Sequence, residues 1–233
     1  MLVPMRAILD AADKNGYAQG AFNVNAVCQV KAAVDVHQIL RSPAIIQGAD
    51  LANGFMGGRT DFANSTLEDK KAGAKNIGAA VKKYAADSDI PVALHLDHGK
   101  NFDSCIAAIE GGYTSVMIDG SSLPFDENVE LTREVVKYAH ERGVTVEGEL
   151  GVLAGVEDHV FAATSTYTNP LSAIDFFKKT GVDALAISYG TMHGANKGKN
   201  AVIRKEIAIA IKECMLHEGI EGYLVSHGSS TVP

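Results

Sequence analysis

Three histidines in the chain share one local setting, and together they could bind a metal ion. His98, His193 and His227 each stand at the end of a short apolar run, and each precedes a glycine. A single histidine in such a place is more often structural than a ligand. Three histidine ligands with an open fourth position are typical of a catalytic rather than a structural zinc site. The sequence therefore predicts a metal centre on these three side chains.

Carboxylates accompany the histidines. Asp97 precedes His98, Asp119 lies at the end of another apolar run, and Glu147 and Glu149 lie in a third. Burial of an unpaired carboxylate is costly, so acids in apolar runs favour a functional interpretation. Adjacent strand residues point to opposite faces, so we expect Asp97 and His98 to reach one site only at the strand end. Asp97 could instead cap a helix or orient a histidine.

Two glycine-bearing turns could bind a phosphate. His193-Gly194 is followed by Lys197, and Gly228-Ser229-Ser230 begins a predicted helix. Such turns expose backbone N–H groups to an anion. A Gly-Ser-Ser sequence alone is common at helix caps. Beside three histidines of metal-binding type, it favours a phosphorylated substrate.

These residues need strands and helices to position them. Most of the apolar runs are rich in Val, Ile and Leu and lack a polar face, as buried parallel strands do. Helical patterns lie between them; one begins at Asn169-Pro170 and ends at Gly181, with matching start and stop signals. The runs cover 20–24, 43–48, 91–98, 114–120, 145–151, 184–190 and 223–228.

Repeated β-α units imply a parallel sheet, which is either a closed barrel or an open doubly wound sheet. In a barrel all strand ends converge on one face, whereas in an open sheet they spread along an edge. Histidines and carboxylates on several strands can act together only if they converge. We therefore expect an α/β fold, a (β/α)8 TIM barrel formed by residues 1–233 as a single domain.

The composition excludes several classes of protein. The chain has 233 residues, a net charge of -7 and 46% hydrophobic residues. An acidic chain without basic clusters is a poor nucleic-acid binder. No apolar run approaches the ~18 residues of a membrane span, and the N-terminus has no signal-peptide pattern. We therefore expect a cytoplasmic protein with a small-molecule substrate and no nucleic-acid or membrane partner.

Six stretches of the chain resemble the class II, zinc-dependent fructose-bisphosphate aldolase family. They follow the order of the family's motifs and span most of the chain, so the resemblance rests on more than one motif. Ketose-bisphosphate aldolases that use the tagatose isomer share them. The stretches are GAFNVN (20–25), PVALHLDHG (91–99), SVMIDGSSLPFDENV (115–129), VEGELG (146–151), YGTMHGANK (189–197) and HGSSTVP (227–233).

The resemblance implies a role for each matching residue. His98, His193 and His227 would hold the Zn²⁺, and Asp119 and Glu149 would lie near an alternative, buried metal position. Asp97 would be the acid/base at the C4 hydroxyl. Asn23 would contact the reacting centre, and Glu157, in the loop after the fifth strand, would take part in proton transfer. The phosphate site would be lined by Gly194, Lys197, Gly228, Ser229 and Ser230, with Na⁺ or K⁺ possible nearby.

The implied activity is reversible cleavage of fructose 1,6-bisphosphate into dihydroxyacetone phosphate and glyceraldehyde 3-phosphate, by a homodimer or homotetramer. Zn²⁺ would act as a Lewis acid in place of a Schiff-base lysine. Three alternatives stay open at this point: a tagatose-bisphosphate aldolase, a metal-dependent hydrolase on the same barrel, and an inactive metal-binding barrel fragment.

Two features depart from the family pattern. Ala49 stands where the family usually has a phosphate-binding serine, and Asp50 beside it would repel a phosphate. The chain stops at Pro233, after the seventh predicted strand, although a (β/α)8 barrel needs an eighth strand and further helices. We therefore expect a C-terminally incomplete barrel that belongs to a longer natural chain.

Overall fold

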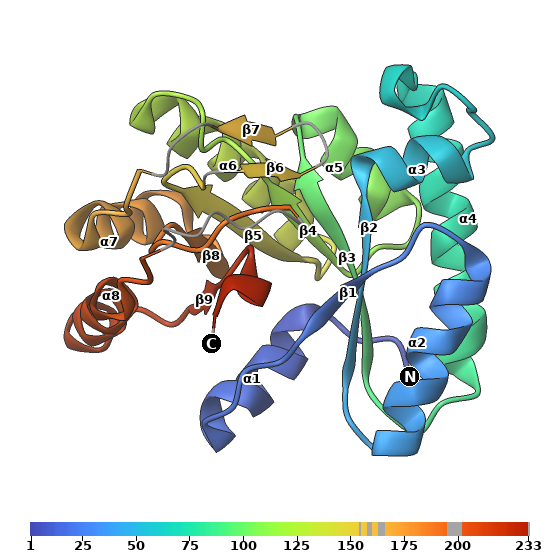
Figure 1. The fold of residues 1–233 in the computed structure, drawn as a ribbon, viewed down its shortest axis with the longest axis horizontal. Coiled ribbons are helices and arrows are strands. Elements are labelled where there is room, and N and C mark those ends of the chain that lie inside the picture. The colour runs from blue at the N-terminus through green and yellow to red at the C-terminus, as the bar shows by residue number, and fades with distance from the viewer. Residues whose placement is uncertain (154, 158–159, 163–165, 195–201, 233) are drawn as a thin grey trace. The chain divides into compact units, whose positions relative to one another are not determined.

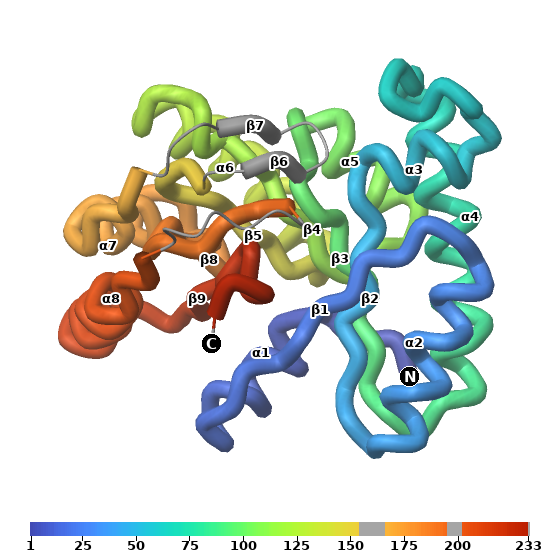
Figure 2. Tube along the Cα trace, viewed as in Figure 1, coloured from blue at the N-terminus to red at the C-terminus, as the bar shows by residue number. Residues whose placement is uncertain are grey.

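The computed structural model describes residues 1–153, 155–157, 160–162, 166–194 and 202–232, in which strands alternate with helices (Figures 1 and 2). Seven strands are hydrogen-bonded in the order β1-β2-β3-β4-β5-β8-β9. Each overlaps one of the seven predicted runs, so the α/β fold class is confirmed. Their bounds are β1 Ala21–Asn23, β2 Ala44–Ala49, β3 Val92–Gly99, β4 Ser115–Ile118, β5 Thr145–Leu150, β8 Ala184–Ile187 and β9 Tyr223–Val225.

The helices fill the intervals between these strands. The predicted signals of one helix are confirmed, because the Asn169 side chain accepts N–H bonds from Leu171 and Ser172, and Gly181 ends the helix with φ 69°. The helices are α1 Met5–Asn15, α2 Val27–Leu40, α3 Asp50–Met56, α4 Leu67–Ala86, α5 Phe102–Glu110, α6 Phe125–His140, α7 Pro170–Thr180 and α8 Lys205–Glu218, with the 3₁₀ turns η1 Phe62–Asn64 and η2 Ser229–Thr231.

The chain comprises two compact units. The first contains Met1–Ile118 and Lys137–Val146, and the second contains Asp119–Val136 and Glu147–Pro233. In the first unit β1, β2, β3 and β4 are parallel neighbours. The Thr145 N–H, at the start of β5, donates to the Thr114 carbonyl before β4. In the second unit the rest of β5 pairs in parallel with β8, and β8 with β9.

Helices cover both faces of the sheet in the first unit. On one face, Met5 and Ile8 of α1 pack against Ile45 of β2 and Ala93 of β3. Strand residues two apart share a face, so His95 and Asp97 lie on the same face of β3 as Ala93. The α1 face of the first unit therefore carries the polar residues at the end of β3.

The opposite face of β2 belongs to α4. A Cβ built on Gly48 would lie 3.3 Å from Ile77 Cδ1 of α4 and only 2.2 Å from the Tyr113 hydroxyl. A side chain at position 48 would therefore collide with the layer of helices. Residues on the α4 face are covered by helices, so only side chains on the α1 face can join His95 and Asp97.

The second unit has the same division. A Cβ on Gly148 of β5 would lie 2.9 Å from the Phe176 ring of α7, and Phe176 also packs edge-on against Phe125 of α6 at 6.1 Å. Gly148 therefore faces the helices. Its neighbours Glu147 and Glu149 point to the opposite face, where both are buried.

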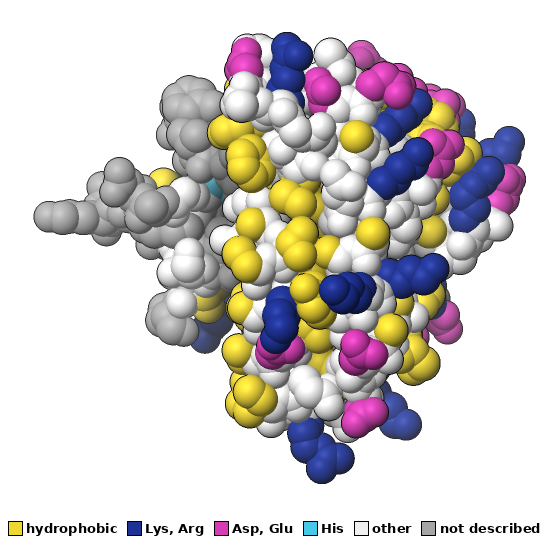
Figure 3. Space-filling view, turned by 90° about the vertical axis from the view of Figure 1, so that its right-hand side faces the viewer, with side chains coloured by type: hydrophobic (Ala, Val, Ile, Leu, Met, Phe, Trp, Pro, Cys, Tyr) yellow, Lys and Arg dark blue, Asp and Glu magenta, His cyan; other side chains and the backbone are white. Residues whose placement is uncertain are grey.

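The exterior of the helices in the first unit carries hydrophobic side chains scattered among lysine, arginine, aspartate and glutamate (Figure 3). Within the part of the chain that the structure describes, no helix is at once long enough and apolar enough to cross a membrane.

A short hairpin follows β5. Its strands are β6 Gly155–Glu157 and β7 Val160–Ala162, which pair antiparallel with Glu157 opposite Val160. The expectation that Glu157 lies in a loop is thus corrected, because the backbone there forms cross-strand hydrogen bonds. Lys197 lies outside the described residues.

Candidate active site

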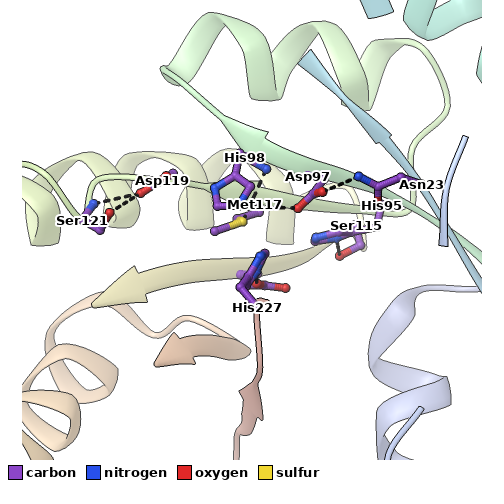
Figure 4. Close-up of polar contacts among 10 residues, drawn as sticks. Asn23, His95, Asp97, His98, Ser115, Met117, Asp119, Ser121 and His227 are labelled. Carbon is purple, nitrogen blue, oxygen red and sulfur yellow. Dashed lines mark hydrogen bonds and ion pairs between the residues drawn. The ribbon is translucent and has the colours of Figure 1, made fainter. Parts of the chain in front are cut away.

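In the first unit, Asp97 and Asn23 are brought together at the end of the sheet. The Asn23 amide Nδ2 donates to Asp97 Oδ2 at 2.9 Å (Figure 4). Asn23 is the last residue of β1 and registers with Gln47 of β2, which in turn registers with His95 of β3. Asp97 is buried, whereas Asn23 is exposed. This hydrogen bond fixes one oxygen of a buried carboxylate, as a positioned acid or base requires.

Asp97 and His98 reach the same region by a distortion of β3. His98 has φ 48°, in the left-handed region, and the register with β4 shifts between Leu96 and Gly99. The backbone is held there by a bond from the His98 N–H to Met117 Sδ at 3.4 Å (Figure 4). As a result His98 Nε2 lies 4.0 Å from Asp97 Oδ1. The two side chains approach each other near the end of β3, where the register with β4 is irregular, although the strand itself continues to Gly99.

His95 is also buried on the α1 face of β3. Its Nδ1 lies 2.8 Å from the Ser115 hydroxyl of β4. The contact ties neighbouring strands together beneath Asp97, because His95 and Asp97 share a face. His95 thus links β3 to β4 next to Asp97. It was not among the predicted metal ligands.

In the second unit, His193 and His227 lie close together. Their ring centroids are 5.9 Å apart with the planes at 63°, and both side chains are buried. His193 follows β8 and His227 follows β9, and these strands are parallel neighbours. Two of the three predicted zinc ligands are therefore adjacent at the carboxyl ends of adjacent strands.

Glu147 is a member of this cluster that the sequence interpretation did not include among the site residues. Its Oε1 lies 2.9 Å from His227 Nε2. The signal that could have identified it is its spacing from Glu149, because residues two apart on a strand share a face. Glu149 itself is buried, and its backbone carbonyl accepts a bond from Asn128 Nδ2 at 2.8 Å.

Asp119 begins the second unit directly after β4. Its Oδ1 accepts bonds from the Ser121 backbone N–H at 3.0 Å and the Ser121 hydroxyl at 2.6 Å (Figure 4). This is a turn in which an aspartate binds the backbone two residues on. Both Asp119 and Glu149 offer carboxylate oxygens, but their predicted role at an alternative metal position stays a prediction.

The predicted phosphate-binding turns have the backbone that such sites use. Gly194 has φ 81° and Gly228 has φ 61°. A Cβ at Gly228 would lie 2.3 Å from the Met192 carbonyl, so the two turns touch closely within the second unit. The Met192 N–H also donates to Thr231 Oγ1 at 3.2 Å. Ser229 and Ser230 are exposed at the start of η2.

The charge of Asp50 is compensated within the first unit. Asp50 is buried, its Oδ2 forms an ion pair with Lys70 Nζ of α4, and the Ser104 hydroxyl donates to the same oxygen at 3.2 Å. A carboxylate held by a lysine and a hydroxyl presents little net charge. The concern that Asp50 would repel a phosphate is therefore weakened by its own partners.

The donor atoms at these strand ends suit a zinc ion. Imidazole nitrogens and carboxylate oxygens are both normal zinc ligands, and a thiolate is not required. In the second unit two buried imidazoles lie side by side with a carboxylate in contact. Imidazole and carboxylate groups that lie together at the ends of parallel strands are the donor set of a catalytic zinc site, which favours a metal-binding interpretation.

Comparison with known proteins identifies the family of the chain. The family model "Fructose-bisphosphate aldolase class-II" matches residues 3–233. A fructose-bisphosphate aldolase of Treponema pallidum is 44% identical over 100% of this chain and 70% of the relative. One of Giardia intestinalis is 42% identical, covering 100% of this chain and 66% of the relative.

A solved structure shares the fold as well. The crystal structure of the YdjI aldolase from Escherichia coli K12 superposes with a TM-score of 0.78 at 28% identity, covering 100% of this chain and 75% of that chain. The family match extends over nearly all of the residues, and it includes each strand that carries a candidate site residue. The chain belongs to the class II fructose-bisphosphate aldolase family.

Proposed function

We propose that the chain cleaves fructose 1,6-bisphosphate reversibly into dihydroxyacetone phosphate and glyceraldehyde 3-phosphate. The observation that carries the proposal is the buried Asp97 carboxylate, bonded to Asn23 and 4.0 Å from His98, in a chain of this family. The names of the Treponema and Giardia relatives support the choice of substrate.

The zinc ion would be held by His98, His193 and His227, with Asp119 and Glu149 at an alternative buried position. The adjacency of His193 and His227 supports this ligand set. When bound, zinc supplies Lewis-acid chemistry: it polarises the ketose carbonyl and stabilises negative charge on the fragment that keeps it. A monovalent cation, Na⁺ or K⁺, belongs to the same proposal, beside the phosphate.

Asp97 would take the proton from the C4 hydroxyl as the bond between C3 and C4 breaks, and return it in the synthetic direction. Its hydrogen bond from Asn23 orients the carboxylate, and burial shields it from water. Asn23, being exposed on the other side of that bond, would contact the substrate. Glu157 would serve proton transfer at the ketose carbon.

The phosphate would bind at Gly194, Lys197, Gly228, Ser229 and Ser230. Left-handed glycines and the exposed serines of η2 support this assignment, because such turns direct N–H groups to an anion. Binding there would orient the substrate without acting on the reacting atoms, which lowers the barrier through positioning.

We also propose that the seven strands form part of a (β/α) barrel in a single domain, and that the protein assembles as a homodimer or homotetramer in the cytoplasm. The parallel β-α order of the described strands supports the barrel. In a barrel, the carboxyl ends of all strands would contribute to one active site.

A coupled assay for triose phosphate release tests the function. Cleavage of fructose 1,6-bisphosphate that is lost with a chelator and restored by zinc is the expected result. Stoichiometric zinc binding without cleavage of this substrate would overturn the proposal. Tagatose 1,6-bisphosphate, run in parallel, decides the sugar configuration, because faster turnover of that isomer would contradict the choice of fructose.

A further inference from the structure

We infer that Glu147 is a positioning residue for His227, which it orients and holds in one tautomer for metal binding. The inference rests on the proposed zinc function and adds a residue that the ligand set does not contain. Its basis is the contact of His227 Nε2 with Glu147 Oε1 at 2.9 Å, between two buried side chains.

Glu147 lies within β5, and His227 lies in the turn that follows β9. Glu147 of β5 registers with Ala184 of β8, and Ala184 registers with Tyr223 of β9, the strand that leads to His227. The contact therefore passes over β8. The residues of β8 that register with Glu147 and Glu149 are Ala184 and Ala186, whose methyl side chains leave room for a glutamate to reach across.

The hydrogen bond has a chemical consequence for the ring. A carboxylate oxygen accepts hydrogen bonds, so the contact with Glu147 Oε1 favours the tautomer of His227 that carries its proton on Nε2. In a neutral imidazole the lone pair is then on Nδ1, which becomes the nitrogen for the metal. Carboxylate partners of metal-bound histidines fix ring orientation and raise ligand basicity in this way.

Zinc affinity of the full chain, measured by chelator competition, tests the inference. We expect Glu147→Ala to weaken zinc binding by about 10–100-fold. Glu147→Gln should weaken it less, because the amide oxygen still accepts the Nε2–H bond. Asp183→Asn is the matched control: it alters an equally buried acid at the N-terminal end of β8, opposite the histidines, and should leave the affinity unchanged.

A second readout does not depend on metal. Nitrogen-15 spectra of the metal-free protein, labelled at histidine and assigned with His227→Asn, should show His227 protonated at Nε2. In Glu147→Ala the ring should become a mixture of tautomers. A role limited to packing would alter the melting temperature without changing the tautomer. If Glu147→Ala folds poorly, Glu147→Leu, which fills the space without an acceptor, should give the same mixture of tautomers, and a retained Nε2–H tautomer there would overturn the inference.

The outcomes separate the two proposals. If the wild type binds zinc, His227→Asn abolishes binding and both Glu147 variants bind as tightly as the wild type with an unchanged tautomer, the inference alone is overturned. If the wild type binds no zinc, the proposed function and the inference fall together. Graded weakening from Gln to Ala, with a changed tautomer, supports the inference.

Discussion

His98 Nε2 and Asp97 Oδ1 lie 4.0 Å apart although the two residues are adjacent on β3. A regular strand would send them to opposite faces. The left-handed φ of 48° at His98 and the shift in register before Gly99 rotate the second side chain toward the first. The register shift thus brings a candidate metal ligand, His98, and a candidate base, Asp97, close together on one strand.

Asp97→Asn tests the base directly. The amide keeps the shape and can still bond to Asn23, but it cannot accept a proton, so kcat should fall by about 10²–10⁴-fold. Zinc content should stay the same. Asp87→Asn, an exposed change at the end of α4, is the control. Steady-state kinetics in which Asp97→Asn keeps kcat within twofold would remove Asp97 from the mechanism.

Lys70→Met should destabilise the first unit strongly. The change leaves the buried Asp50 carboxylate without its cation, which costs about 3 kcal/mol of unfolding free energy. Lys71→Met is the matched control, because Lys71 pairs at 3.4 Å with the exposed Glu68 and such pairs contribute about 0–1 kcal/mol. Urea unfolding measures the unfolding free energy of both variants. Equal losses would show that the buried Asp50–Lys70 pair contributes no more than an exposed pair.

Gly228→Ala should destabilise the fold more than Gly219→Ala. Both glycines have a left-handed backbone, at φ 61° and 64°, which costs an L-residue about 1–2 kcal/mol. Only at Gly228 does the new methyl group meet another atom, the Met192 carbonyl at 2.3 Å, and overpacking adds about 1–3 kcal/mol. Thermal unfolding compares the two, and similar melting temperatures would contradict the close contact.

Thiol labelling should distinguish the cysteines. Cys28 is exposed, whereas Cys105 is buried. Burial raises the pKa of the Cys105 thiol, and the nearby Asp50 charge raises it further, so the thiol stays protonated and unreactive at neutral pH. Maleimide should modify Cys28 in seconds to minutes and Cys105 only after unfolding. Peptide mass spectrometry at successive times measures which cysteine is labelled first. Rapid labelling of Cys105 in the native protein would contradict the prediction.

The sequence was sufficient to locate most of the fold. Apolar runs bounded by glycine and polar residues predicted each strand of the sheet, and Asn169, Pro170 and Gly181 predicted the ends of α7. Strand runs and helix ends depend on residues close together in the sequence, so local patterns can predict them. The hairpin at Glu157 was missed because its strands are too short to give a periodic signal.

The candidate site was only partly predictable for a different reason. His193 and His227 could be proposed as neighbours because they end successive strands of a parallel sheet. The contact of Glu147 with His227 depends on the register of three strands, and the pairing of Asp50 with Lys70 on how α3 meets α4. Neither follows from the order of residues along the chain.

X-ray absorption at the zinc edge, on the zinc-loaded full chain, tests the central claim that three histidines hold the metal. The account predicts nitrogen ligands at about 2.0–2.1 Å with imidazole scattering from three rings, reduced to two in each of His98→Asn, His193→Asn and His227→Asn that still binds zinc. A spectrum with sulfur ligands, or without imidazole scattering, would contradict it.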